Sequence, residues 1–264
     1  MRLPIYQVDA FTDRLFSGNP AAVIPLDAWL AEDVLQNIAA ENNLSETAFF
    51  VKDGDGFELR WFTPTVEVPL CGHATLAAAH VLMGILEPHR TEVRFSSRQS
   101  GDLFVTQDRQ YLTLDFPAHA ITDDAPPDEA VTALGAAPEG VWRAQDNWLA
   151  LYRDEAAVRL LTPDHRILAT ATDHGIIATA PGTDAVDFVS RYFAPAWGVD
   201  EDPVTGSAHC ALTPFWAQRL GKTILRARQV SARGGELLCT HDGNRVRIAG
   251  QAVLYLEGEI RLAI

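Results

Sequence analysis

Residues 57–64 read FELRWFTP and residues 188–195 read FVSRYFAP, so that four of the eight positions are identical. On average residue usage, unrelated positions are identical about once in eighteen. The two octapeptides lie 131 residues apart, close to half of the 264-residue chain. Both are rich in aromatic and apolar residues and end in proline, which is typical of a β-strand followed by a turn. The match therefore indicates that the second half of the chain repeats the first.

A second pair of segments supports the repeat. Residues 97–114 match residues 231–248 at an offset of 134, with Ser, Gly, Leu, Thr and Asp shared at equivalent positions. Two ungapped matches in the same order and at nearly the same offset are typical of a tandem duplication. The alternative is that short strand and turn segments became similar by composition alone, because β-strands draw on few residue types.

The predicted elements are mostly strands. Short β-branched or aromatic runs, bounded by Gly, Pro, Asn and Asp, fill the first half and predict strands, with one helix over residues 29–43. Residues 72–86 predict a second helix, which is apolar on nearly every side and must therefore be buried all round. In the second half Pro214 interrupts the helical pattern, so that helix either kinks or begins later. We expect an α+β fold of tandem duplicated domains, each a β-barrel-like sheet wrapped around a central buried helix.

The polar, proline-bearing stretch HAITDDAPPDEA, residues 119–130, is the predicted joint. We therefore expect an N-terminal repeat domain at residues 1–124 and a C-terminal repeat domain at residues 125–264. Small ligands often bind where two domains meet. The expected active site is accordingly the cleft between the two domains.

Composition narrows the classes of function. With 47% hydrophobic residues the chain should fold, and its formal charge of −14 argues against nucleic-acid binding, which needs a basic surface. No signal-peptide core and no membrane-spanning apolar stretch is evident, so we expect a soluble, cytoplasmic protein. The three cysteines lack CxxC spacing, which predicts reduced thiols rather than disulfides or structural zinc.

Cys71 and Asp202 occupy the same place in the two repeats, seven positions after Pro64 and Pro195. Both precede a predicted helix start, in the sequences CGHAT and DPVTGS. Free backbone N–H groups at helix starts bind carboxylates, and small residues allow a ligand to approach the main chain. The candidate carboxylate-binding residues are Gly72, Ala74, Thr205, Gly206 and Ser207. The alternative is that both corners are ordinary helix caps.

Glu46, in the sequence NNLSETAFFV, breaks the symmetry of the repeat. No acidic residue lies at the corresponding place near Gly175 or Ile177. A carboxylic acid where a strand enters a cleft would be partly desolvated and suited to accept and return a proton near neutral pH. Glu46 is therefore a candidate general acid/base, with Ser45 beside it as a candidate substrate contact. The alternative is an exposed glutamate at a strand end.

Other polar residues give weaker predictions. A metal site needs three or four convergent ligands, and the spacing of His80 and His209 does not supply them, so no metal is expected. Cys210 and Cys239 are interpreted as small buried residues. Asn19 follows a turn and is given little weight as a residue facing the cleft.

With these residues identified, the chain resembles the phenazine-biosynthesis PhzF-like family from end to end. The segments VDAFT, FSGNPAAV, NLSET, FTPTVEVPLCGHAT and EDPVTGSAH occur in the family's order. The resemblance implies a diaminopimelate-epimerase-like fold, no cofactor, a homodimer and a small carboxylate substrate. It also implies that Glu46 is the proton-shuttling acid/base, that His73 and Asp202 lie around the substrate, and that backbone groups near Gly72, Gly206 and Ser207 bind its carboxylate.

Three hypotheses of function remain open at this point. The first is a cofactor-independent isomerase in which Glu46 moves a proton within one bound acid. The second is an amino- or hydroxy-acid racemase or epimerase that uses Cys71 and Asp202. The third is a non-catalytic protein that binds a carboxylate metabolite. The phenazine-making enzyme has a small non-thiol residue where this chain has Cys71, so the phenazine precursor is not assumed as the substrate.

Overall fold

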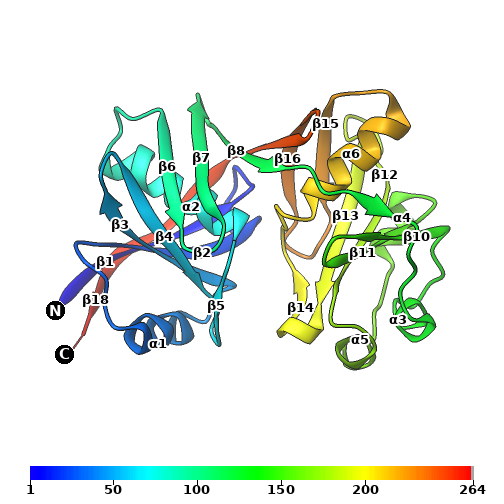
Figure 1. The fold of residues 1–264 in the computed structure, drawn as a ribbon, viewed down its shortest axis with the longest axis horizontal. Coiled ribbons are helices and arrows are strands. Elements are labelled where there is room, and N and C mark those ends of the chain that lie inside the picture. The colour runs from blue at the N-terminus through cyan, green and yellow to red at the C-terminus, as the bar shows by residue number, and fades with distance from the viewer. Residues whose placement is uncertain (263–264) are drawn as a thin grey trace. The chain divides into compact units, whose positions relative to one another are not determined.

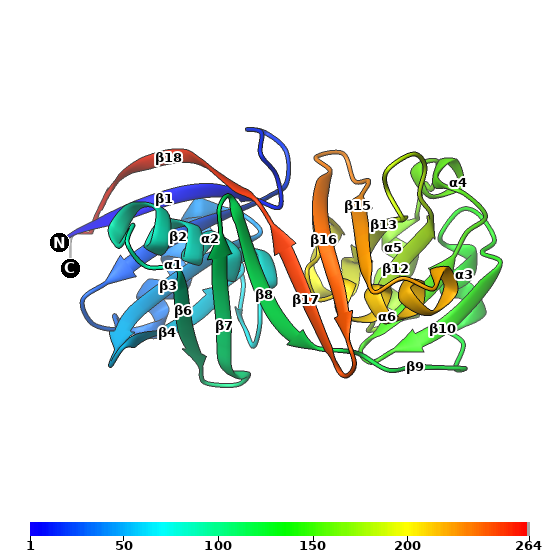
Figure 2. The ribbon, with the colours of Figure 1, turned by 90° about the horizontal axis from the view of Figure 1, so that it is seen from above.

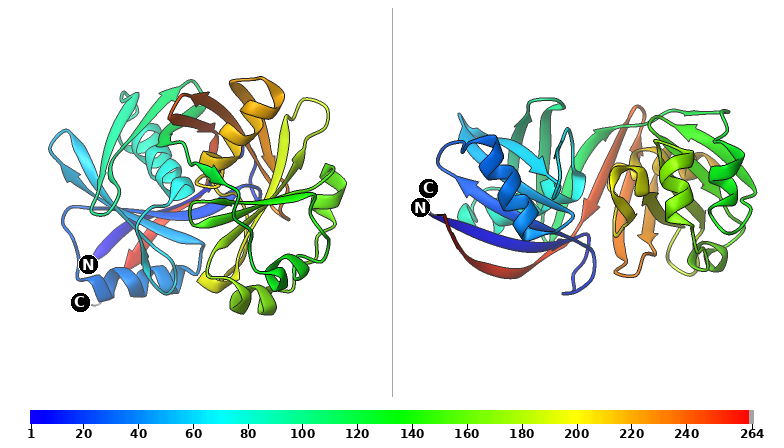
Figure 3. Two further views of the ribbon diagram at one scale, coloured as in Figure 1. Left: turned by 45° about the vertical axis from the view of Figure 1, so that its right-hand side comes forward. Right: turned by 90° about the horizontal axis from the view of Figure 1, so that it is seen from below.

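The structure is a computed structural model that describes residues 1–262. The chain forms two compact units: unit 1 holds Met1–Asp115 and the C-terminal segment from Ala249 onward, and unit 2 holds Phe116–Ile248. This division differs from the expected break between residues 124 and 125. The C-terminal segment returns to unit 1 because β18 (Ala252–Arg261) pairs antiparallel with β1 (Arg2–Ala10). The Met1 amino group donates to the Leu262 carbonyl at 2.8 Å, so the start of β1 and the end of β18 lie side by side (Figure 3).

Unit 1 is a mixed sheet with two helices. Its strands pair in the order β18, β1, β2, β3, β4, β6, β7, β8, with β2–β3 and β4–β6 parallel and the other pairs antiparallel. The remaining elements of unit 1 are β2 (Asn19–Leu26), α1 (Glu32–Asn42), β3 (Glu46–Asp53), β4 (Gly56–Phe62), β5 (Glu67–Val68), α2 (Gly72–Val81), the π-helix η1 (Leu82–Leu86), β6 (Glu92–Ser97), β7 (Gly101–Asp108) and β8 (Tyr111–Pro117), whose last residues belong to unit 2.

Helix α2 is the central helix of unit 1. Nine of its ten residues are buried, and only His80 is partly exposed, which confirms the prediction of a helix covered on all sides. It packs against β1, β2, β3 and β18, and strands of unit 1 surround it (Figures 1 and 2). Alanines at positions 77–79 allow this close approach, because they add little bulk beyond the helix backbone.

Unit 2 has the same kind of architecture. Its elements are β9 (Ile121–Thr122), α3 (Asp128–Thr132), β10 (Gly140–Ala144), β11 (Asn147–Leu151), α4 (Glu155–Arg159), α5 (His165–Ala171), β12 (Gly175–Pro181), β13 (Phe188–Ala194), the 3₁₀-helix η2 (Pro195–Trp197), β14 (Val199–Asp202), α6 (His209–Leu220), β15 (Ile224–Gln229), β16 (Gly235–Asp242) and β17 (Arg245–Gly250), whose last two residues belong to unit 1. The helix α6 packs against β15 and β16 and is largely buried, as α2 is in unit 1.

The strand pairings repeat between the units. In unit 1, β2–β3 is parallel, β3–β4 antiparallel, β4–β6 parallel and β6–β7 antiparallel. In unit 2, the corresponding series is β11–β12, β12–β13, β13–β15 and β15–β16, with the same directions. The two octapeptides form β4 and β13, and their arginines, Arg60 and Arg191, each pair with a glutamate on the next strand. The chain is therefore an α+β protein of duplicated units.

Each repeat is closed by a strand that follows the other repeat in sequence. Strand β9 comes directly after β8, yet it pairs with β10, the next strand of unit 2. Strand β18 comes directly after β17 and pairs with β1, the first strand of unit 1. A division at a single point in the chain cannot describe unit 1. Its strand β18 comes from the far end of the chain and covers the sheet edge that β1 would otherwise expose.

The second helix begins later than the corner at Asp202 predicts. Helix α6 starts at His209, and Thr205, Gly206 and Ser207 lie in the turn before it. Pro214 lies inside α6 and has no N–H to offer the Cys210 carbonyl. That carbonyl instead accepts a hydrogen bond from the His119 N–H at 3.0 Å, so the proline is accommodated without a helix break.

Among residues 1–262, no helix has both the length and the apolar character needed to cross a membrane.

Candidate functional site

Glu46 is the first residue of β3 and pairs in register with Ala21 of β2. Asn19 begins β2, two residues before Ala21, and alternate residues of a strand share a face. Asn19 and Glu46 both contact His73, the second residue of α2. Two strand starts and one helix start thus converge on the same imidazole.

The contact between Glu46 and His73 is the centre of this group. Glu46 Oε2 lies 3.0 Å from His73 Nε2, and the two side chains are 16% and 5% exposed. The distance is that of a hydrogen bond, but the angles are not, so neither atom has a hydrogen-bond partner among the described residues. A buried carboxylate oxygen and a buried ring nitrogen that are not bonded elsewhere remain available to a ligand.

The other ring nitrogen of His73 has two neighbours. Asn19 Nδ2 lies 3.1 Å and Cys71 Sγ 3.4 Å from His73 Nδ1. Asn19 is fully buried, and Cys71 is the residue immediately before α2, in an extended conformation. As the N-cap residue of α2, Cys71 forms no side-chain capping hydrogen bond. The sequence indicates Asn19 only weakly, through its position after Gly18 in FSGNPAAV.

Burial and charge act on the titratable groups in opposite ways. Burial raises the pKa of the Cys71 thiol to about 11; the Glu46 charge adds to this, while His73 opposes it. Burial alone lowers the pKa of His73, but the negative charges that Cys71 and Glu46 can carry at close range leave it well above its usual value. Because its own pKa is about 11, Cys71 is a neutral thiol at neutral pH. The charge that favours a proton on His73 is therefore that of the Glu46 carboxylate.

Glu46, Cys71 and His73 offer donor atoms that all lie within 4.8 Å of one another. A structural zinc site uses four protein ligands and needs a deprotonated thiolate. This group has three donors, and its thiol is held in the protonated form. That no metal is bound here stays a prediction.

The corner at Asp202 lies in unit 2 and forms its own network. Thr205 Oγ1 donates to Asp202 Oδ2 at 2.5 Å, and Gln229 Nε2 donates to the Asp202 carbonyl at 2.7 Å. The Gln229 side chain also accepts from the Thr205 N–H at 2.9 Å. The turn at Gly206 and Ser207 is thereby held by β15, and Ser207 is exposed. Gln229 lies 27 residues after Asp202, and no local pattern in the sequence points to it.

The place of Glu46 is filled differently in unit 2. Gly175 begins β12 and pairs with Asn147, as Glu46 pairs with Ala21 in unit 1. Tyr192 Oη donates to Asn147 Oδ1 at 2.7 Å, and a Cβ atom at Gly175 would lie 2.1 Å from Tyr192 Oη. The tyrosine and asparagine thus occupy the space beside the strand start. The predicted asymmetry is present, because unit 2 has neither the carboxylate nor room for one.

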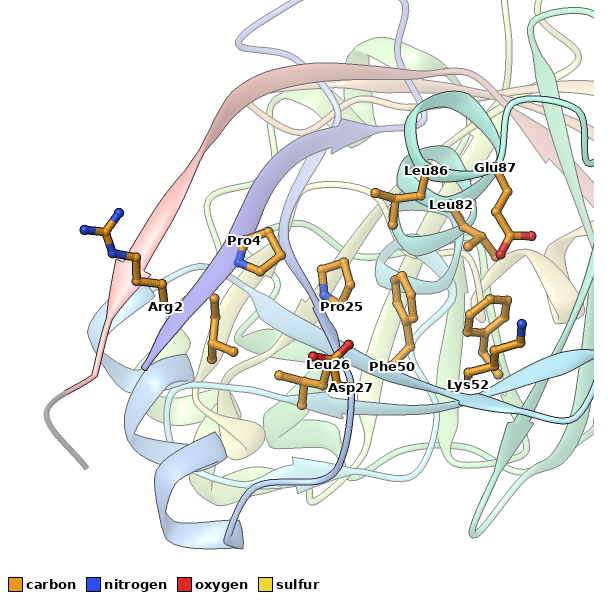
Figure 4. Close-up of a pocket in the computed structure, with 12 residues that line it drawn as sticks. Arg2, Pro4, Pro25, Leu26, Asp27, Phe50, Lys52, Leu82, Leu86 and Glu87 are labelled. Carbon is orange, nitrogen blue, oxygen red and sulfur yellow. The ribbon is translucent and has the colours of Figure 1, made fainter.

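A cavity of about 340 Å³ lies elsewhere in unit 1, between β1, β2, β3 and η1 (Figure 4). Pro25, Phe50 and Leu82 are among its apolar lining residues, with Asp27 and Lys52 among its charged ones. None of the predicted site residues lines it. It is therefore separate from the group around Glu46.

The structure brings together some of the predicted residues. Glu46, His73 and Cys71 meet in unit 1, with Ser45, Gly72 and Ala74 as their chain neighbours. Asp202 and Thr205 meet in unit 2, with Gly206 and Ser207 in the same turn.

Comparisons with known proteins agree with this fold and these motifs. The family model described as "Phenazine biosynthesis-like protein" (PhzC-PhzF) matches residues 8–258. A Pseudomonas aeruginosa protein named "Uncharacterized isomerase PA3578" is 55% identical over 263 residues, which cover 100% of both chains. The crystal structure of a PhzF-family phenazine biosynthesis protein from Enterococcus faecalis superposes with a TM-score of 0.94 at 47% identity, covering 99% of this chain and 100% of that one.

A more distant neighbour shows the reach of the fold. A hydroxyproline epimerase from Agrobacterium vitis superposes with a TM-score of 0.59 at 12% identity, covering 98% of this chain and 91% of that one. At this identity the likeness concerns the fold alone, and it confirms the expected epimerase-like architecture. The match of the family model over nearly the whole chain and the full-length relatives lead to one conclusion: this chain belongs to the PhzC-PhzF family of phenazine biosynthesis-like proteins.

Proposed function

We propose that the protein is a cofactor-independent isomerase that moves a proton within a small carboxylate-bearing substrate, with Glu46 as the general acid/base. The observation that carries the proposal is the 3.0 Å approach of Glu46 Oε2 to His73 Nε2, both buried and both without a hydrogen-bond partner among the described residues. Partly buried carboxylates beside an imidazole are suited to accept and return protons. The relatives named as isomerases support the reaction class.

The proposed step balances without any oxidant or reductant. The Glu46 carboxylate takes a proton from a carbon next to an unsaturated system, and the C–H electron pair enters that system. The same proton then returns from the Glu46 carboxylic acid to a different carbon of the bound molecule, which restores the carboxylate. The substrate and product are isomers, and the protein ends in its starting state.

Backbone groups support the carboxylate class of substrate. Helix α2 has ten residues, and its N-cap residue, Cys71, forms no side-chain capping hydrogen bond. The positive end of the helix dipole favours an anion at this place. We propose that Gly72 and Ala74, with Ser45 beside Glu46, contribute substrate contacts. Asp202 is proposed as a second catalytic residue, and Thr205, Gly206 and Ser207 as further contacts.

A thiol-based racemase is less well supported than this isomerase. Burial raises the pKa of Cys71 to about 11, so the thiolate that would remove a proton is scarce at neutral pH. Asp202, the other half of such a pair, already accepts a 2.5 Å hydrogen bond from Thr205. The carboxylate of Glu46 needs no such activation.

The test is isomerisation by the wild-type protein and by Glu46→Gln. The full-length chain would be incubated in deuterium oxide with a panel of unsaturated, amino and hydroxy acids. The isomerised product would be measured by NMR, and mass spectrometry would show whether the moved hydrogen came from the substrate or from the solvent. For any acid that the wild type isomerises, Glu46→Gln should lower the rate by about 10²–10⁴-fold, the usual contribution of a general acid/base. Glu41→Gln, an exposed glutamate on α1, is the matched control and should keep full activity. Full activity in Glu46→Gln would refute the role of Glu46, and binding without any isomerised product would favour a binding protein.

A further inference from the structure

The environment of His73 Nδ1 determines where the neutral imidazole carries its proton. Asn19 Nδ2 lies 3.1 Å from this nitrogen, and an amide nitrogen can only donate a hydrogen bond. Nδ1 must then accept, which requires its bare lone pair. A neutral imidazole has one N–H, so the proton lies on Nε2, the nitrogen that faces Glu46 Oε2 at 3.0 Å.

Asn19 is held in place by its backbone. It is fully buried and pairs with Ala10 of β1 at the start of β2. The preceding residue, Gly18, has a φ of +67°, and a Cβ atom there would lie 2.2 Å from the Ala10 carbonyl oxygen. Only glycine fits this turn without strain. The amide therefore reaches His73 from a rigid strand start and not from a mobile loop.

Cys71 does not compete with Asn19 for this role. Its Sγ atom lies 3.4 Å from Nδ1, and a thiol is a weak hydrogen-bond donor and acceptor. With a pKa of about 11, Cys71 remains a thiol at neutral pH and can share the lone pair of Nδ1 only as a weak donor. Both neighbours of Nδ1 thus favour the same proton position.

We propose that Asn19 is a positioning residue that selects the tautomer of His73 with the proton on Nε2. In this form the imidazole offers an N–H toward Glu46, and toward a substrate atom that enters between them. The amide also disfavours a second proton on Nδ1, because two N–H groups would then face each other. The catalytic consequence rests on the proposed function, whereas the tautomer itself does not.

The deciding experiment is a series of long-range ¹H–¹⁵N correlation spectra of the imidazoles in uniformly ¹⁵N-labelled, full-length protein. The series starts at pH 7.5 and continues upward until the ring of His73 is neutral, because its raised pKa favours a doubly protonated ring at lower pH. Protonated and bare ring nitrogens resonate far apart, and the His73 signals are those missing from the His73→Asn variant. The expected result is a neutral ring with a protonated Nε2 and a bare Nδ1. A neutral ring with its proton on Nδ1 would overturn the proposal. Because the free protein is measured, this result is independent of whether Glu46→Gln loses activity.

Two variants and one control variant assign the cause. Asn19→Asp replaces the donor with an acceptor and should lower the ratio of Nε2–H to Nδ1–H by roughly tenfold or more, the effect expected of one charge-assisted hydrogen bond. Asn37→Asp, an exposed residue on α1, makes the same change of charge and should leave the His73 signals unchanged. Cys71→Ala should keep the proton on Nε2. A move of the proton to Nδ1 in Cys71→Ala would show that the thiol, not Asn19, selects the tautomer.

Discussion

His209 should make the stability of the protein depend on pH in a defined direction. It is fully buried at the start of α6, where its ring lies 5.8 Å from that of Phe188 and its Nδ1 lies 2.8 Å from the Thr205 carbonyl oxygen. Burial lowers its pKa to about 4, and the hydrogen bond to Thr205 offsets only part of this effect. In the unfolded chain a histidine has a pKa of about 6.5.

The sign and the size follow from linkage between folding and protonation. Above about pH 6.5 the imidazole is neutral in both states, so its contribution to stability is fully present. Below that pH the unfolded chain takes up a proton that the folded chain excludes, and the free energy of unfolding falls by about 1.4 kcal/mol per pH unit. The loss continues as the pH falls toward about 4. It amounts to about 3 kcal/mol in total.

The assay is urea denaturation of the wild type and His209→Asn between pH 7.5 and 4.5. The asparagine amide can take the place of Nδ1 as a donor to the Thr205 carbonyl, but it does not titrate. Its smaller size lowers stability by a constant amount. The advantage of the wild type over the variant should therefore shrink by about 2.7 kcal/mol over two pH units below 6.5. The exposed His89→Asn is the control and should show a difference that does not change with pH. A wild-type advantage that stays constant to within about 1 kcal/mol for His209→Asn would refute the reasoning.

Three further experiments, two substitutions and one chemical modification, test other parts of the structure. Arg60 is 2% exposed and forms a two-pronged pair with Glu67, so Arg60→Met should cost about 3 kcal/mol of unfolding free energy in urea, and an unchanged midpoint would contradict this. Gly175→Ala places a Cβ atom 2.1 Å from Tyr192 Oη and should cost about 2 kcal/mol, whereas greater stability would show that the tyrosine moves freely. Cys71, with its pKa raised by burial to about 11, should react slowly with iodoacetamide at pH 7.5 and about tenfold faster per pH unit toward pH 10, as followed by mass spectrometry; rapid labelling at pH 7.5 would argue against a buried thiol.

Local patterns in the sequence predicted much of the fold because they depend on near neighbours. The octapeptides at residues 57–64 and 188–195 form equivalent strands, and the apolar run from residue 72 forms a helix buried on nearly every side. Alternation in strands and unbroken apolarity in a helix are consequences of burial that can be read along the chain. The second helix begins at His209, after a turn at residues 206–208, which is later than the corner at Asp202 predicts and agrees with the later start that Pro214 allowed.

The site was less accessible to this reasoning. Glu46, His73 and Asp202 were candidates from the sequence, yet no spacing predicts that Glu46 meets an imidazole 27 residues away. Asn19 reaches the same ring across 54 residues, and it was given little weight. Whether a polar side chain points into a site depends on strand register, and a shift of one residue would turn it to the opposite face.

By itself, the sequence determined that the chain is duplicated, that each copy is mainly β with a buried helix, and that one copy has an acidic residue that the other lacks. These are properties of composition, periodicity and repetition. Only the tertiary structure decided that β18 closes unit 1, that Tyr192 and Asn147 fill the place of the missing acid, and that Asn19 and Glu46 hold opposite sides of one imidazole. The physical reason is that these contacts join residues from distant parts of the chain, and their geometry exists only once the strands have paired and the core has packed.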